Sequence, residues 1–216
     1  MDARIDQVVT SGEVTEDGTA YEMENNTWII GDDSEVIVID PGHDAQAVLA
    51  AAGDREVIAV ICTHAHRDHV AAAMQTAERD EAPVALHPKD LPLWRETHDD
   101  DPDIEVADGG TFEVADVRLE VIFSPGHTPG SISLYCEELG VVFSGDTLLA
   151  TGPAPYCGAF PDFPGQLTAV GEHLLTLPPD TRVLPGHGEE TTVEAAEKRF
   201  DGWVTAGPDA AAADTA

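Results

Sequence analysis

The sequence predicts an α/β (α+β) fold in which two β-sheets pack together and helices cover them, all within a single domain. Short runs rich in Val and Ile alternate with helix-like segments, and this passage from strands to helices occurs twice along the chain. The two halves are similar in make-up but show no convincing internal repeat. At 216 residues the chain is long enough to bury one sizeable core.

The first half contains the apolar segments NTWIIG and EVIVID, joined by a polar turn, which predict two successive strands. The next helix ends at Gly53, and the acidic, turn-rich segment 98–110 predicts an exposed loop. In chain order, the predicted elements are strands over 26–31 and 35–40, a helix over 43–53, a strand over 56–62, a helix over 68–79, a strand over 83–87 and a short helix over 88–97.

In the second half, apolar residues recur at spacings of four and three from Phe163 to Leu177, which predicts one amphipathic helix. We expect the domain to span residues 1–205 and residues 206–216 to form a disordered tail. The other predicted elements are strands over 112–114, 117–123, 131–136 and 141–146, a strand with its exit loop over 182–188, and a last helix over 189–200.

The charge balance is strongly acidic. There are 42 Asp and Glu residues against 10 Lys and Arg, a net charge of −32, and only two of the cations are lysines. Carboxylates spread along the whole chain favour adaptation to a salt-rich cytoplasm, where salt screens their mutual repulsion; an ordinary acidic enzyme is the alternative. So little basic surface argues against binding nucleic acid.

The sequence also predicts a cytoplasmic protein with reduced thiols. No apolar run is long enough to cross a membrane, and the first ten residues lack the basic-then-apolar pattern of a signal peptide. The three cysteines cannot all pair within one chain and show no C-x-x-C spacing. Cys62 and Cys136 lie in apolar strands and are expected in the core, whereas Cys157 lies in a loop.

Ligand-type side chains gather where four predicted strands end. Because rigid strands position the loops at their ends, these groups are expected to meet at one edge of the sheets. Five histidines and two aspartates can supply three ligands to each of two divalent ions plus one shared carboxylate. Zinc suits these ligands best, with iron and manganese as alternatives. The candidate ligands are His64, His66, Asp68, His69, His127, Asp146 and His187.

The segments THAHRDH, GHTPGS, GDTL and PGHG, in this order, resemble the metallo-β-lactamase superfamily of hydrolases. The resemblance runs from about residue 26 to residue 187 and implies a four-layer αβ/βα sandwich with the metals at one edge. It also implies a ligand set for each ion and a bridging carboxylate. The implied assignment is His64, His66 and His127 for the first ion, Asp68, His69 and His187 for the second, and Asp146 between them.

Within the superfamily, the chain looks like the glyoxalase II branch, which hydrolyses acyl-thioesters of a small thiol. The best-known β-lactamases have cysteine in place of Asp146, and the oxygen-reducing diiron branch has glutamate in place of His66. A tRNA-processing nuclease would need a basic surface. The chain lacks the basic C-terminal region with which glyoxalase II holds glutathione. Another small thiol, such as γ-glutamylcysteine, is therefore an alternative carrier of the acyl group.

The expected chemistry is attack by a metal-bridging hydroxide on a thioester carbonyl, with a thiolate as leaving group. Asp68 is the expected catalytic residue, orienting the water as well as binding metal. A persulfide dioxygenase, with one iron on His64, His127 and Asp146, is the nearest alternative. A lactone hydrolase and a non-enzymatic metal-binding protein are further alternatives.

Several other residues have open roles. Asp40 is either a hydrogen-bond acceptor for a ligand histidine or a simple strand-end aspartate. Arg67 either meets a substrate carboxylate or is solvated. The aromatic loop after Asp146 either lines the cleft or lies on the surface, and the oligomeric state is not readable. The loop candidates are Tyr156, Cys157, Phe160 and Phe163, and the histidines expected to be non-ligands are His43, His87, His98 and His173.

Overall fold

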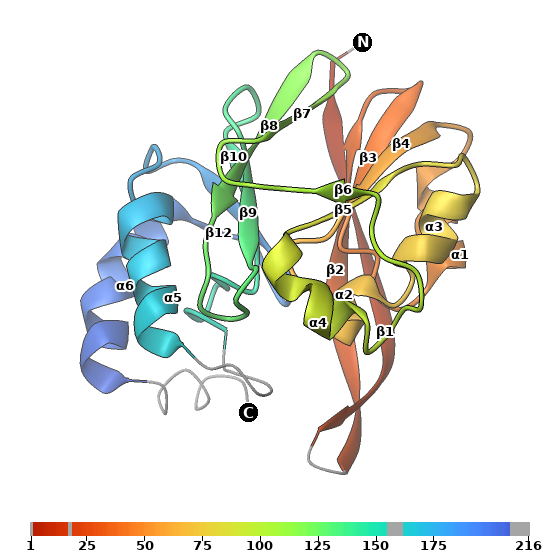
Figure 1. Cartoon of the computed structure of the whole chain (residues 1–216). Helices are drawn as coiled ribbons and strands as arrows, with labels where there is room; N and C mark the ends of the chain where they lie inside the picture. Colours follow the sequence, from red (N-terminus) through yellow and green to blue (C-terminus); the bar gives the residue numbers. More distant parts are fainter. Residues whose placement is uncertain (1, 17–18, 155–161, 208–216) are drawn as a thin grey trace.

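Two six-stranded sheets lie face to face, and each has helices on its outer face (Figure 1). The structure, a computed structural model, describes residues 2–16, 19–154 and 162–207. The layers follow the order helix, sheet, sheet, helix, which is the predicted αβ/βα sandwich. Among the described residues, no helix is both long and apolar enough to cross a membrane.

The first sheet is formed by the amino-terminal half of the chain, in the order β1-β2-β3-β4-β5-β6. The strands from β3 to β6 run parallel, so their carboxyl ends meet at one edge. Its strands are β1 (Arg4–Glu16), β2 (Thr19–Gly31), β3 (Glu35–Ile39), β4 (Glu56–Ile61), β5 (Val84–Leu86) and β6 (Ile104–Glu105), and its helices are α1 (Ala45–Ala52), α2 (Arg67–Val70), α3 (Ala73–Glu78), the 3-10 turn η1 (Pro88–Asp90) and α4 (Leu91–Trp94).

The second sheet is formed by the carboxyl-terminal half, in the order β12-β11-β10-β9-β8-β7. Within it β10 and β11 are parallel, and β7, β8, β9 and β10 are antiparallel neighbours. Its strands are β7 (Thr111–Val114), β8 (Val117–Phe123), β9 (Ile132–Cys136), β10 (Val141–Gly145), β11 (Arg182–Pro185) and β12 (Thr191–Thr192), and its helices are α5 (Phe163–Ala169), the π-helical turn η2 (Val170–Leu174) and α6 (Val193–Ala206).

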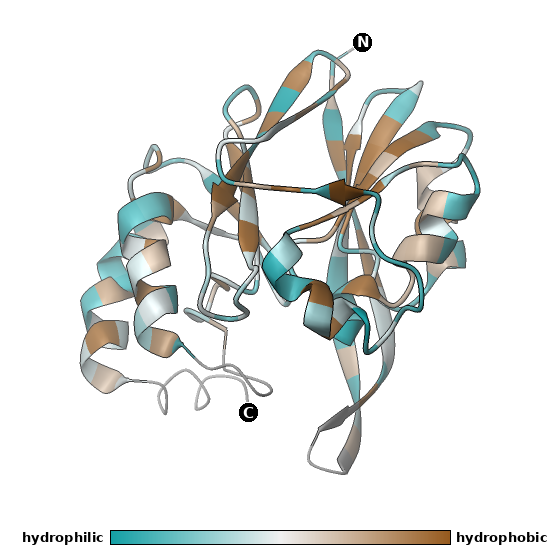
Figure 2. Cartoon of the chain, viewed as in Figure 1, coloured by the Kyte–Doolittle hydropathy of each residue, from teal (hydrophilic) through white to brown (hydrophobic). Residues whose placement is uncertain are grey.

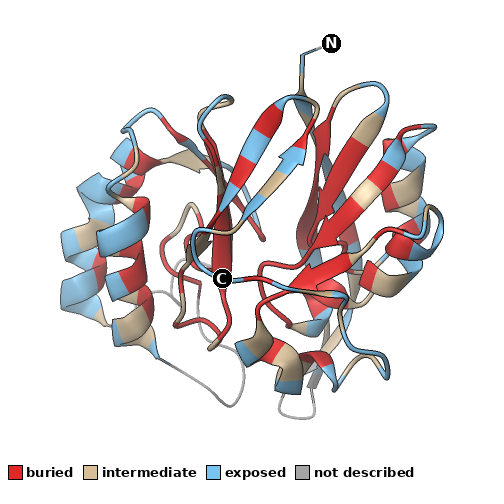
Figure 3. Ribbon diagram, turned by 45° about the horizontal axis from the view of Figure 1, so that its top comes forward, coloured by how far each residue is buried: buried red, intermediate tan, exposed pale blue. Residues whose placement is uncertain are grey.

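Side chains along β3 alternate between the core that lies between the two sheets and the core that lies between the first sheet and its helices. Ile37 and Ile39 face the second sheet, while Val36 and Val38 face the helices α1 and α3. All four side chains are buried because the sheet is covered on both faces, as expected of a mostly parallel sheet. Figures 2 and 3 show the same arrangement, with hydrophobic, buried strands inside and hydrophilic, exposed helix surfaces outside.

The structure corrects the amino-terminal prediction. Residues 4–25 were not expected to form strands, but β1 and β2 make a hairpin of thirteen paired positions. The predicted helix over 68–79 is interrupted, because the backbone N–H of Ala72 donates to the carbonyls of Pro41 and Gly42 rather than to its own helix. The predicted loop 98–110 contains the short strand β6.

The structure also corrects the carboxyl-terminal prediction. The helix expected over 163–177 ends at Leu174, and its last turn is π-helical. The last helix starts at Val193, not at 189, because the Thr192 side chain accepts from the N–H of Ala195 and caps it. It runs to Ala206, since Trp203 is buried against the second sheet. Most of the predicted tail lies outside the described residues.

Candidate metal centre

Six of the seven candidate ligands form two groups near the start of α2, the short helix labelled in Figure 1. β4 ends at Ile61, and the chain then passes through the His64 and His66 loop into α2, whose first turn carries Asp68 and His69. The other three come from loops of the second sheet. His127 follows β8, Asp146 follows β10 and His187 follows β11. The parallel strands thus bring together groups that are far apart in sequence.

The first ligand group consists of His64, His66 and His127. Nδ1 of His66 lies 3.1 Å from Nε2 of His64 and 3.0 Å from Nε2 of His127. His64 and His127 are buried, and burial lowers the pKa of His64 well below its usual range and that of His127 to about 3. These rings are therefore neutral at physiological pH, the form that binds metal.

The second ligand group consists of Asp68, His69 and His187. Nε2 of His69 lies 3.1 Å from Nε2 of His187, and Oδ2 of Asp68 lies 3.1 Å from the same His187 nitrogen. Burial disfavours protonation of both rings, but the surrounding carboxylates, chiefly Asp146, outweigh it. They raise the pKa of His69 well above its usual range and that of His187 to about 10. A divalent ion would have to displace these protons.

Asp146 lies between the two groups. Its Oδ2 is 3.3 Å from Nε2 of His127 and 3.5 Å from Nε2 of His187, and its Oδ1 is 3.5 Å from Nε2 of His69. The buried Oδ1 makes no hydrogen bond. This contact with both groups is what a bridging carboxylate requires.

The donor geometry fits a pair of divalent ions. Two nitrogens that bind one tetrahedral zinc at its usual bond length lie about 3.4 Å apart. The separations within each group, from 3.0 to 3.5 Å, are close to this value. A buried carboxylate oxygen without a hydrogen bond, and carboxylates that raise the pKa of two histidines, both indicate that positive charge belongs here.

Asp40 supports the second group through a hydrogen bond to the ring nitrogen of His69 that faces away from the other ligands. Its Oδ2 lies 3.0 Å from Nδ1 of His69, which leaves Nε2 of that ring directed toward His187. Its two oxygens also accept from the N–H and the hydroxyl of Thr63. Of the two roles open to this residue, the structure supports the hydrogen-bond acceptor.

Buried amides that were not predicted from the sequence hold the loops of the second sheet. Nδ2 of Asn26 donates to the carbonyls of Pro185 and Gly188, on either side of His187. Nε2 of Gln166 donates to the carbonyls of Asp146 and Thr147. Neither amide belongs to a recognisable motif, so only its contacts reveal its role.

The structure assigns no ligand role to the remaining candidates that it describes. Arg67 is exposed and Phe163 is half-buried, while Tyr156, Cys157 and Phe160 lie outside the described residues. His98 hydrogen-bonds the carbonyl of Val70 and His87 stacks on Phe123. In the described part of the chain, no metal-ligating group includes the four histidines expected to be non-ligands, which are His43, His87, His98 and His173.

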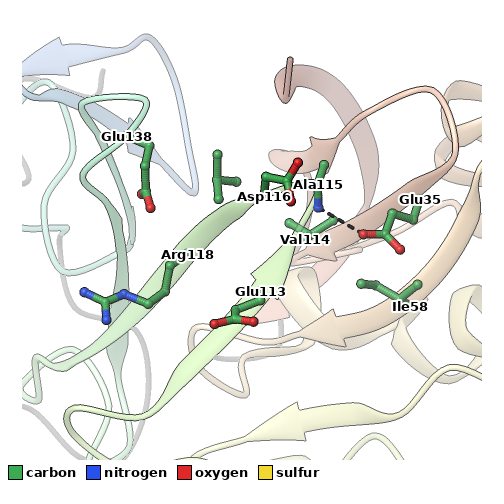
Figure 4. A pocket seen from close by; sticks show the side chains of 9 residues that line it. Glu35, Ile58, Glu113, Val114, Ala115, Asp116, Arg118 and Glu138 are labelled. Atoms are coloured by element: carbon green, nitrogen blue, oxygen red, sulfur yellow. Dashed lines mark hydrogen bonds between the residues drawn. The ribbon is translucent and has the colours of Figure 1, made fainter. Parts of the chain in front are cut away.

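A cavity of about 650 Å³ lies at the opposite edge of the sandwich, beside the β7–β8 turn (Figure 4). None of the candidate ligands lines it. Its charged groups are Arg118 and four carboxylates, one of which, Glu35, accepts from the N–H of Ala115. The carboxylates are Glu35, Glu113, Asp116 and Glu138.

Comparisons with known proteins agree with this architecture. A family model described as the metallo-beta-lactamase superfamily matches residues 20–187. A probable metallo-hydrolase of Bacillus subtilis, YqgX, is 30% identical over 187 residues, which cover 79% of this chain and 88% of that protein. A hydroxyacylglutathione hydrolase of Aeromonas hydrophila is 36% identical over 168 residues, which cover 76% of this chain and 61% of that protein.

Two solved structures extend the similarity to three dimensions. TTHA1623 in a di-iron-bound form is 30% identical, with a TM-score of 0.69 over 82% of this chain and 93% of that one. The B3 metallo-beta-lactamase BLEG-1 is 26% identical, with a TM-score of 0.73 over 89% of this chain and 97% of that one. The same fold thus carries more than one activity among its relatives.

Proposed function

The chain belongs to the metallo-β-lactamase superfamily, and from this premise we propose that it hydrolyses acyl-thioesters of a small thiol, in the manner of glyoxalase II. The hydroxyacylglutathione hydrolase of Aeromonas hydrophila, at 36% identity, supports this branch. The observation that carries the proposal is the pair of ligand groups with Asp146 in contact with both.

In this proposal His64, His66 and His127 hold one divalent ion and Asp68, His69 and His187 hold the other, with zinc preferred over iron and manganese. Bound ions of this kind supply a water molecule of lowered pKa and a Lewis acid for a carbonyl oxygen. Asp40 fixes the ring of His69, and the carbonyl of Glu24 accepts from Nδ1 of His187. Both rings then direct Nε2 into the site.

The water of lowered pKa would release a proton to solvent, and Asp68 would orient the resulting hydroxide as it attacks the thioester carbonyl carbon. Its Oδ2 lies within reach of both His69 and His187, so its position is set by the second group. The carbon–sulfur bond then breaks and the carrier leaves as a thiolate. Because a thiolate is a good leaving group, the site needs no strong general acid, and no further proton donor is assigned.

The carrier is proposed to be a small thiol, with glutathione and γ-glutamylcysteine both as candidates. The chain spans about three fifths of the length of the Aeromonas hydroxyacylglutathione hydrolase. The carboxyl-terminal cations that follow His187 are Lys198 and Arg199. Lys198 donates to Glu194, and Arg199 donates to the carbonyl of Ala150.

We place the enzyme in a salt-rich cytoplasm, on the grounds of its net charge of −32.

The test is hydrolysis of S-lactoyl thioesters of several small thiols in molar KCl, on protein whose metal content has been assayed. Release of free thiol is followed with a chromogenic disulfide. The expected result is turnover with about two metals per chain, loss of turnover in His127→Ala, and no cleavage of a chromogenic β-lactam. No thioester turnover, with one iron per chain and oxygen uptake on a persulfide, would replace the proposal with a dioxygenase.

A further inference from the structure

Asp90 is a fully buried carboxylate that none of the ligand motifs contains. It ends the 3-10 turn η1, which follows β5 at the same sheet edge as the candidate metal centre. No sequence pattern predicts a role for it. An ionised side chain without solvent contact requires partners, and its partners are informative.

The carboxylate of Asp90 joins the two loops that carry the first ligand group. Its Oδ2 accepts from the backbone N–H of Ala65, at 3.0 Å, and from the hydroxyl of Thr128, at 2.7 Å. Its Oδ1 accepts from the N–H of Gly130, at 2.6 Å. Ala65 stands between His64 and His66, and Thr128 directly follows His127.

Gly130 shows how closely the second of these loops sits on the carboxylate. A Cβ atom at this position would lie 2.6 Å from Cγ of Asp90, so only glycine allows the approach. The loop is therefore shaped around Asp90 as well as bonded to it.

Asp90 is separate from the second ligand group. None of its described hydrogen bonds reaches the segments that carry Asp68, His69 or His187. Those rings are held instead by Asp40 and by the carbonyl of Glu24. Asp90 thus holds the loops of the first group and makes no described hydrogen bond with the second, whereas Asp40 contacts both His69 and Thr63.

We propose that Asp90 is a positioning residue that sets the spacing of His64 and His66 relative to His127, and with it the metal affinity of the first group alone. The inference rests on the metal-binding roles proposed above. A buried acid that only stabilised the fold would affect both groups equally.

The variant that tests this is Asp90→Asn, because the amide has the same size but must turn its NH₂ toward a backbone N–H. It is made in two backgrounds, His187→Ala, which leaves the first group intact, and His127→Ala, which leaves the second. Zinc affinity is measured by competition with a chromophoric chelator. We expect the affinity of the first group to fall about tenfold or more, and that of the second to change less than about twofold.

The matched control is Asp103→Asn, at a residue that directly precedes β6 and bonds the first residue of β5. Asp103 accepts from the N–H of Val84 at 2.9 Å, so the control also removes a carboxylate that holds backbone, at a residue that makes no described contact with either ligand group. Both affinities should stay unchanged. Thr128→Val, which removes one of the three donors, replaces Asp90→Asn if that variant does not fold, and a smaller loss confined to the first group is expected.

Two outcomes would overturn the inference and leave the proposed function standing. One is unchanged affinity of the first group in these variants, and the other is an equal loss at both groups. If the unmodified protein binds no zinc at either group, the proposed function fails and the inference fails with it.

Discussion

At the scale of the residue, Asp40 illustrates how a side chain outside the ligand set can control it. It sits at the end of β3 with a φ of 52°, a conformation that Asp and Asn tolerate better than other side chains. It aligns His69 and also binds Thr63, one residue before His64. One carboxylate therefore touches the supports of both ligand groups.

Asp40→Asn should lower metal content and kcat while leaving the fold intact, because the amide keeps the backbone conformation but cannot accept from all three donors. Loss of such a partner typically costs about 10- to 100-fold in affinity or activity. Metal analysis after gel filtration, kcat and the circular dichroism spectrum check this. Asp33→Asn, at an exposed turn, serves as the control. Full metal content with undiminished kcat would show that Asp40 is a strand-end aspartate only.

The two described cysteines should resist alkylation in the native protein. Both are fully buried, and burial raises the pKa of the Cys62 thiol well above its usual range and that of Cys136 to about 11. At pH 8 the thiolate is scarce and unreachable in both. Iodoacetamide followed by peptide mass spectrometry should find them unmodified in the native protein and modified after unfolding. Rapid native labelling of either residue would contradict their placement.

At the scale of the element, the loop after β11 shows how tightly the site is built. A Cβ on Gly186 would lie 2.5 Å from Oδ1 of Asp146 and 2.5 Å from Cε1 of His69. This loop is also tied to β2, since the N–H of Asn26 donates to the carbonyl of Gly186. The loop cannot move away without breaking its link to the first sheet.

Gly186→Ala should therefore abolish binding of the second metal and most activity, with about one metal retained per chain. Metal analysis and thioester turnover measure both effects. A variant with two metals and normal kcat would mean that the loop has room to shift.

Helix α6, unlike the loop after β11, has room for a larger side chain at its glycine. Gly202 lies inside this helix, and a Cβ there would meet nothing within 4 Å. Gly202→Ala should raise the free energy of unfolding by about 0.5–1 kcal/mol, because alanine loses less backbone entropy in a helix. Denaturant unfolding in molar KCl checks the change, and unaltered turnover is the control. Destabilisation would indicate that α6 does not extend past residue 200 in solution.

At the scale of the whole molecule, the net charge of −32 dominates. Self-repulsion of this size destabilises a compact state, and salt shortens the Debye length from about 10 Å at 0.1 M to about 3 Å at 1 M. The described ion pairs that relieve the repulsion are mostly exposed, such as Arg95 with Asp101 and Arg182 with Glu190. Such pairs contribute little individually.

Raising KCl from 0.1 to 2 M should therefore increase Tm by about 5 °C or more, which corresponds to roughly 1–2 kcal/mol for a chain of this size. Thermal unfolding followed by circular dichroism measures it. Sucrose at equal osmolality is the control, since it favours compact states without screening charge. A Tm independent of KCl, or matched by sucrose, would remove the case for a salt-adapted protein.

The sequence by itself determined the fold class, most strands and the seven candidate ligands, because each depends on short-range patterns: period-two burial, strand-exit loops and the H-x-H-x-D-H spacing. It missed the β1–β2 hairpin and the true limits of α6, which depend on pairing and burial between distant segments. Only the tertiary structure decided which polar residues hold the ligands in place. Asn26, Asp90 and Gln166 are single polar residues without a motif, and their roles exist only where folding removes them from water and brings distant donors and acceptors to them.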